Sequence, residues 1–85
     1  MSEKYQITGG QIAAALALLR LSQAELAKAA NVSVPTIGRM VASDGQAVGM
    51  ANNLLAVKTA LESAGVEFIP ENGGGAGVRL AKAKE

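Results

Sequence analysis

Four residues able to contact another molecule lie in the segment Ser33–Arg39. Ser33 and Thr36 carry hydroxyl groups, Val34 has a small apolar side chain, and Arg39 has a guanidinium group. Hydroxyl and guanidinium groups hydrogen-bond phosphates and the edges of bases, and a small apolar group can contact a thymine methyl. These residues occupy the exposed start of a predicted short helix, which is how a helix-turn-helix presents its second helix to the major groove of DNA.

Two helices and a tight turn must position this segment. Ser22 and Glu25 have the spacing of a capping box, which predicts a helix over Gln23–Ala30. Asn31 follows where the turn needs a left-handed residue, a conformation that Asn tolerates well. The helix Gln23–Ala30 should therefore end at Asn31, where the turn begins.

The second helix is predicted over Val34–Val41. Ser33 is its N-cap, and Pro35 lies in the first turn, where a missing amide proton costs little. Ile37 should anchor this helix to the core. Gly38 weakens the helix slightly but permits a neighbouring group to come close.

Patterns in the rest of the chain predict a mainly α protein. Thr8 and Gln11 fit a second capping box. We expect a helix from about Gly9 to Arg20, a last helix from about Met50 to Gly65, and strands over Val66–Ile69 and Val78–Leu80. In the last helix, Met50, Leu54, Val57 and Leu61 should lie on one stripe. Glu67 and Arg79 should pair across the strands.

The predicted fold is a helix-turn-helix bundle of four to five helices with a C-terminal β-strand or hairpin segment. Residues 1–65 would form the DNA-binding bundle, and residues 66–85 the strand segment and a polar tail. We expect dimer contacts from the last helix and from the strand segment Val66–Leu80. Residues 1–6 are a second polar tail. The chain has 85 residues with one Phe, one Tyr and no Trp. A monomer core built mainly from small side chains is thin, which favours a dimer.

The composition argues against several classes of function. The chain has no Cys and no His, so we expect no disulfide, no metal site and no cofactor. Its seven carboxylates are scattered, which argues against an enzyme. No apolar run is long enough for a membrane span, and the start of the chain lacks the pattern of a signal peptide, so we expect a cytoplasmic protein. The net charge of +1 argues for few phosphate contacts per chain.

The segment Gln23–Ile37, read as QAELAKAANVSVPTI, resembles the XRE family of phage-repressor and Cro-like regulators. The segment Ala64–Gly75 is also similar to small bacterial members with a C-terminal strand. The resemblance implies a repressor-like fold and a homodimeric, sequence-specific transcriptional regulator on a roughly palindromic operator in double-stranded DNA. It also implies contacts for six residues: phosphates for Gln23 and Asn52, base edges or thymine methyls for Ser33, Val34 and Thr36, and guanine or a phosphate for Arg39.

Other interpretations stay open for the same features. Ser33 and Ser22 are helix caps in any case, Thr36 could complete a cap, and a lone Arg is usually a solvated charge. A protein-interaction module, such as an antitoxin or anti-activator with a protein partner, could use the same helices. An exposed apolar face on the last helix would favour that alternative. The glycine-rich segment 73–77 lacks the Gly-Lys-Ser/Thr ending of a phosphate loop and is better explained as a hairpin tip.

Overall fold

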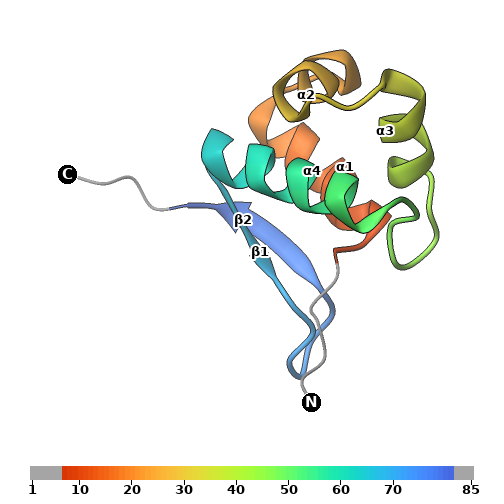
Figure 1. Ribbon diagram of the computed structural model, residues 1–85. Coiled ribbons are helices and arrows are strands. Elements are labelled where there is room, and N and C mark those ends of the chain that lie inside the picture. The colour runs from red at the N-terminus through yellow and green to blue at the C-terminus, as the bar shows by residue number, and fades with distance from the viewer. Residues whose placement is uncertain (1–6, 82–85) are drawn as a thin grey trace.

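A computed structural model describes residues 7–81 as four helices followed by a two-stranded antiparallel hairpin (Figure 1). The predicted polar segments 1–6 and 82–85 lie outside the described residues. The helices form one packed group, and the hairpin extends away from it. The elements are α1 (Gly9–Leu19), α2 (Gln23–Ala30), α3 (Val34–Val41), α4 (Ala51–Ala64), β1 (Val66–Ile69) and β2 (Gly77–Leu80).

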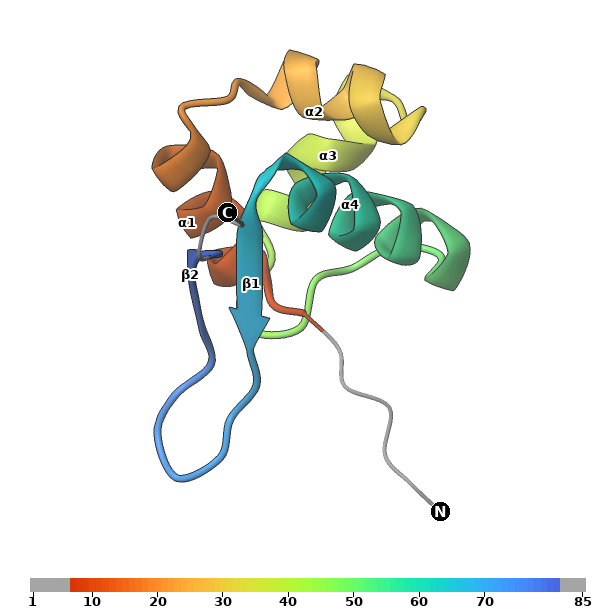
Figure 2. The same ribbon diagram turned by 90° about the vertical axis from the view of Figure 1, so that its left-hand side faces the viewer.

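A single hydrophobic core joins all four helices. Its largest fully buried side chains come from each of them: Ile12, Leu26, Ile37, Met40, Val57 and Leu61. Val66 and Phe68 of β1 bury their side chains against the same core. Figure 2 shows that α1 and α4 lie on opposite sides of the molecule, with β1 running below α4. The mainly α bundle with a C-terminal hairpin is thus confirmed, with four helices.

The first helix begins as predicted and ends one residue earlier than predicted. The Thr8 hydroxyl accepts from the Gln11 amide at 3.0 Å, and the Gln11 side-chain oxygen accepts from the Thr8 amide at 2.8 Å. Arg20 lies outside the helix because its backbone is left-handed, with φ 58°. Its amide bonds back to the Ala17 and Leu16 carbonyls, which closes the helix end.

The prediction that Met50 belongs to the apolar stripe of the last helix is wrong. The helix begins at Ala51, and Met50 is the N-cap with an extended backbone. Its side chain therefore does not follow the helical period, and it is 68% exposed. Val57 and Leu61 are fully buried and Leu54 is half-buried, so the rest of the stripe is confirmed.

The hairpin pairs Val66 with Leu80 and Phe68 with Val78. Because side chains alternate along a strand, these four residues share one face of the hairpin. On the other face, the predicted pair forms between Glu67 and Arg79, with Nε 2.8 Å from the carboxylate. The second strand starts at Gly77, one residue before its predicted start.

A side chain from α1 fastens the end of the hairpin. Gln11 is 2% exposed, and its Nε2 donates to the carbonyls of Ile69 at 3.1 Å and Gly77 at 2.9 Å. These two residues face each other across the strands. Gln11 therefore caps its own helix and holds the distal end of the hairpin against that helix.

No helix within residues 7–81 combines the length and apolar character that crossing a membrane requires.

Candidate nucleic-acid interface

The turn between α2 and α3 has the predicted left-handed residue. Asn31 has φ 58° and ψ 47°, and its amide bonds to the carbonyls of Ala27 and Lys28. The Val32 amide also bonds to the Ala27 carbonyl, at 3.0 Å. At the start of α2, the Ser22–Glu25 capping box is confirmed. Both ends of α2 are therefore fixed by local hydrogen bonds, which sets the direction in which α3 leaves the turn.

The third helix is amphipathic and shows its polar side to solvent. Ile37 and Met40 are fully buried in the core, as predicted for the Ile37 anchor. Ser33, Val34 and Arg39 are exposed, and Thr36 is partly exposed. No described residue covers this side of α3, so the four predicted contact residues on it are accessible together.

The polar side chains of α3 form a hydrogen-bonded chain. The Ser33 hydroxyl donates to Thr36 Oγ1 at 2.8 Å and accepts from the Thr36 amide at 3.3 Å. Arg39 Nη2 donates to Thr36 Oγ1 at 3.3 Å. Ser33 is thus a helix cap. Thr36 Oγ1 bonds to the Ser33 hydroxyl and not to the Ser33 backbone amide, so the reciprocal bond found in the capping boxes of α1 and α2 is not formed at α3. Arg39 is exposed and uses one of its five donors in this chain, and Thr36 is partly exposed, so both side chains can donate to an external acceptor.

Gln23 lies beside α3, although it belongs to α2. A Cβ atom built on Gly38 would lie 3.5 Å from Gln23 Oε1, so the two helices meet at this glycine through the Gln23 side chain. Gln23 is the first residue of α2, where free backbone amides and the helix dipole favour an anion. The structure thus brings Gln23 next to the surface formed by Ser33, Val34, Thr36 and Arg39.

Charge is distributed unevenly along the described residues. Residues 7–19 have no charged side chain, residues 20–42 hold three basic groups and one acidic group, and residues 43–81 hold two basic and four acidic groups. Lys58 and Arg79 each bond to a carboxylate. Arg20, Lys28 and Arg39 make no ion pair within residues 7–81. The unpaired positive charges therefore lie within residues 20–42, which include α2, the turn and α3. The net charge of the whole chain does not show this difference.

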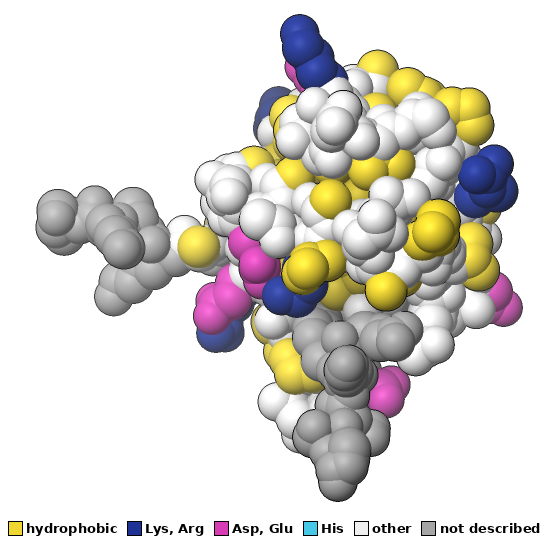
Figure 3. Space-filling view, viewed as in Figure 1, with side chains coloured by type: hydrophobic (Ala, Val, Ile, Leu, Met, Phe, Trp, Pro, Cys, Tyr) yellow, Lys and Arg dark blue, Asp and Glu magenta, His cyan; other side chains and the backbone are white. Residues whose placement is uncertain are grey.

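These cations do not merge into one basic patch. In the face shown in Figure 3, dark-blue side chains lie at the top, at the right edge and at the lower left, where they adjoin magenta ones, and no continuous blue area joins these three places. Cations spaced in this way can each contact a different phosphate of a nucleic-acid backbone, but together they would bind a single compact anion only weakly.

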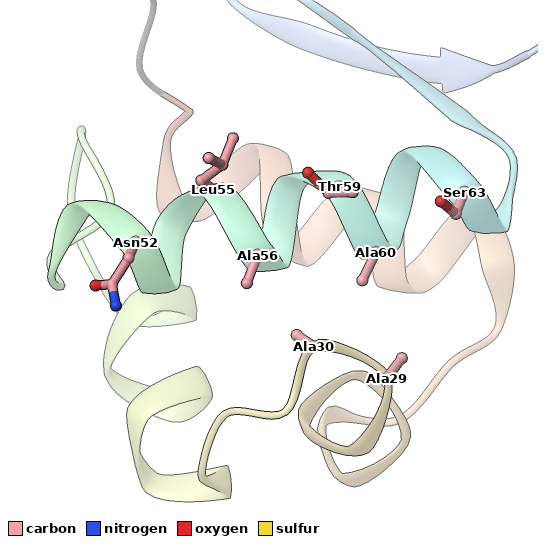
Figure 4. Close-up of a pocket in the computed structure, with 8 residues that line it drawn as sticks. All are labelled: Ala29, Ala30, Asn52, Leu55, Ala56, Thr59, Ala60 and Ser63. Atoms are coloured by element: carbon pink, nitrogen blue, oxygen red, sulfur yellow. The ribbon is translucent and has the colours of Figure 1, made fainter.

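Asn52, the sixth predicted contact residue, comes from a different element. It is exposed in the first turn of α4 and lies at one end of an open groove between α2 and α4 (Figure 4). The groove has a volume of about 550 Å³ and is otherwise lined by small side chains and Leu55. Asn52 therefore does not share the surface of α3 itself.

The described residues offer hydrogen-bond donors and cations at this site, and residues 7–81 contain no group of three His, Cys, Asp or Glu side chains placed to hold a metal ion. Comparison of the chain with protein-family models finds no match, and comparison with curated proteins finds none either.

Proposed function

We propose that the protein is a repressor-like, sequence-specific DNA-binding regulator of the XRE type, acting in the cytoplasm as a homodimer. The exposed side of α3 enters the major groove. Thr36 and Arg39 read base edges, and Val34 contacts a thymine methyl. Gln23 and Asn52 bind phosphates on either side of the groove.

The observation that carries this proposal is the hydrogen-bonded chain from Ser33 through Thr36 to Arg39. Thr36 is partly exposed and Arg39 is exposed, and Thr36 Oγ1 accepts from Arg39 Nη2 at 3.3 Å, which favours one orientation of the guanidinium. Major-groove acceptors, such as guanine O6 and N7, are the partners that Arg recognises best. A pre-positioned guanidinium loses less side-chain entropy when it binds than a freely rotating one does.

The same geometry divides the roles among the hydroxyls. Ser33 uses its proton and accepts the Thr36 amide within the cap. Its main role in the proposal is to hold α3 and Thr36 in position, with a base contact available only through its remaining lone pair. We therefore assign more of the sequence discrimination to Thr36 and Arg39 than to Ser33.

Selection from a random duplex library tests the proposal, because the operator need not be known beforehand. The wild-type protein should enrich one motif with two-fold symmetry. Arg39→Ala should lose that motif while keeping the wild-type circular dichroism spectrum. Arg79→Ala is the matched control, since Arg79 is an exposed arginine outside the helix-turn-helix. Enrichment of the same motif by Arg39→Ala would show that α3 does not read the bases.

A protein-binding function is the second candidate, because apolar side chains are exposed near the start of α4. Val48, Met50 and Leu55 are 53%, 68% and 64% exposed. An antitoxin or anti-activator would bind its protein partner through this cluster. In that case Leu55→Ser should abolish regulation in the cell, while Arg39→Ala should leave it unchanged. The DNA-binding proposal expects the opposite pair of results.

A further inference from the structure

The outer side of α1 has no polar side chain. Its exposed residues are Gly10, Ala13, Ala14, Ala17 and Leu18, and the one polar side chain that α1 carries, Gln11, is buried. A surface helix of a small protein normally presents charged or polar groups to water. A helix that is apolar all round is normally covered on both sides, and within residues 7–81 α1 is covered on only one.

The strand next to α1, β2, also exposes a large apolar side chain, Leu80. Leu80 pairs with Val66 and shares its face of the hairpin, the face that packs on the core. Val66 is buried, yet Leu80 is 55% exposed. Figure 2 shows α1 and β2 together along one side of the molecule, opposite α4. The exposed residues of α1 together with Leu80 form what we term the α1–β2 face.

We propose that the α1–β2 face is the surface through which two copies of this chain associate. The inference rests on the homodimer of the proposed function, and it names the surface that makes the dimer. A two-fold interface brings each residue of the face near its own copy, so a charged face would meet like charges. The absence of charge from residues 7–19 removes that repulsion and fits a second copy of the same chain.

The shape of α1 suits close contact with an identical helix. Gly10, Ala14 and Ala17 follow one another at spacings of four and three residues, which places them on one stripe. Small side chains on such a stripe let two helix axes approach to the lower end of the usual range, about 8 Å. Leu18 near the end of α1 and Leu80 on β2 are both exposed, and they supply the larger apolar groups that such a seam can bury.

The area that a stable dimer needs requires both elements. An interface at the lower limit buries about 600 Å² on each partner, which is about a ninth of the 5492 Å² accessible surface of this chain. A helix of 11 residues is about 16 Å long and about 10 Å wide, so its outer side alone projects about 160 Å². The outer side of α1 alone falls short of a standard interface and Leu80 of β2 adds one large apolar side chain, so we expect a weak dimer rather than an obligate one.

The outer side of α4 is a poorer candidate than the α1–β2 face. Leu55 is exposed there, but the same helix carries the Lys58–Glu62 ion pair, at 2.7 Å, with both side chains partly open to solvent. Two copies meeting through α4 would have to accommodate these charges. We therefore assign the dimer contact to α1 and β2, whereas the sequence pattern had suggested the last helix together with the strand segment.

The position of the α1–β2 face agrees with binding to a palindrome. In Figure 1, α3 lies on one flank of the molecule while α1 lies behind α4. The two views show that the outer sides of α1 and α3 point in different directions. A two-fold axis running past α1 can then direct the α3 helices of both copies to the same side, which is what two half-sites on one face of DNA require.

Sedimentation equilibrium of the full chain without DNA tests the inference. The wild-type protein should form a dimer at about 0.1 mM, as a small interface would allow. Ala14→Glu should raise the dimer dissociation constant at least tenfold, since it sets two carboxylates against each other across the two-fold axis. Glu is a good helix former and Ala14 is exposed, so the variant should keep its fold. Leu80→Glu tests the strand half of the face in the same way.

Thr59→Glu is the matched control, because Thr59 is exposed at the middle of α4. It should leave the dissociation constant within about threefold of wild type. A monomeric wild-type protein at about 0.1 mM, or Ala14→Glu and Leu80→Glu variants that dimerise like wild type, would overturn the inference. A dimer that Thr59→Glu disrupts would also overturn it and assign the contact to α4.

The outcome is separable from that of the DNA-binding proposal. A dimer that Ala14→Glu disrupts, in a protein that enriches no DNA motif, would support the inference and refute the proposed function. If the wild-type protein enriches a palindrome while Ala14→Glu and Leu80→Glu dimerise like wild type, the proposed function is supported and the inference about the α1–β2 face is refuted. If both proposals hold, Ala14→Glu should enrich a half-site in place of the palindrome.

Discussion

Replacing Gln11 by Glu should destabilise the protein far more than an exposed substitution of the same kind. The Gln11 amide donates to the carbonyls of Ile69 and Gly77 at 3.1 and 2.9 Å, while its oxygen accepts from the Thr8 amide at 2.8 Å. Gln11→Glu keeps the acceptor for Thr8, because Glu serves equally well in a capping box. It removes both donors, so the variant isolates the attachment of the hairpin to α1.

The expected loss follows from these contacts. Two hydrogen bonds contribute about 0.5–1.5 kcal/mol each, and a buried group left without its partner costs about 1–3 kcal/mol. An added negative charge in the first turn of α1 recovers about 0.3–1 kcal/mol from the helix dipole. We expect a net loss of about 2–4 kcal/mol in the free energy of unfolding at neutral pH. In a domain of this size, that lowers Tm by about 10–30 °C.

The loss should depend on pH, with a defined sign. Burial and two facing carbonyls favour the protonated form of the introduced carboxyl, so its pKa in the folded state lies above its unfolded value of about 4.3. The destabilisation is therefore complete above the folded-state pKa and shrinks as the pH falls toward about 4. When protonated, the carboxyl also regains one donor for a carbonyl of the hairpin.

Thermal unfolding followed by far-ultraviolet circular dichroism measures this effect, since the chain has no Trp to serve as a fluorescent probe. Gln46→Glu is the matched control, because Gln46 is exposed and bridges to Thr8 through its backbone. It should change stability by no more than about 0.5 kcal/mol. If Gln11→Glu at neutral pH is as stable as this control, the Gln11 amide does not hold the hairpin and the reasoning fails.

Four other predictions follow from single sites. Gly9→Ala should destabilise the protein by about 1–3 kcal/mol, because a Cβ there would lie 2.5 Å from a backbone carbonyl oxygen of residue 43; a wild-type Tm would contradict the close approach. Gly38→Ala should instead stabilise by about 0.5–1 kcal/mol, since the nearest atom to its Cβ is 3.5 Å away; a lower Tm would show that this helix contact is tighter than described. Arg79 lowers the pKa of Glu67 from its ordinary value of 4.5, so the pair stabilises the folded state above about pH 4.5 and this stabilisation is lost as the pH falls through the folded-state pKa. Glu67→Gln should remove this small stabilisation, and added salt should weaken it in the wild type. Unfolding curves of the variant that coincide with wild type at both neutral and acid pH would exclude the effect. Lys28→Ala should make the salt dependence of dimer binding to DNA shallower by about 1.8 in the slope of log K against log salt, and an unchanged slope would remove Lys28 from the contacts.

The elements of the fold could be predicted because their signals are local. The Ser22–Glu25 capping box and the left-handed Asn31 each depend on groups within one helical turn, so neighbouring residues are enough to define the ends of α2. The same holds for the Ser33 cap of α3. The error at Met50 has the complementary cause. Hydrophobic spacing continued past the helix start, and only the backbone of the loop before α4 shows that the helix begins one residue later.

The candidate site was only partly predictable. The exposure of Ser33, Val34, Thr36 and Arg39 follows from helical periodicity once Ile37 is assigned to the core. The bond between Arg39 and Thr36, which orients the guanidinium, depends on rotamers that a pattern of residue types does not encode. The excess of basic over acidic groups in residues 20–42 could have been found by counting charges in segments of the chain rather than over its whole length.

The amino-acid sequence alone determined where α2 and α3 begin and end and which side of α3 is polar, because caps, turns and periodicity act over a few residues. The tertiary structure alone decided that Gln11 reaches across 58 and 66 residues to the two strands of the hairpin. It also decided that Leu80 lies uncovered beside an uncharged α1. Both features arise from groups far apart in the chain, and only packing determines whether such groups meet a partner, meet each other or stay exposed to water.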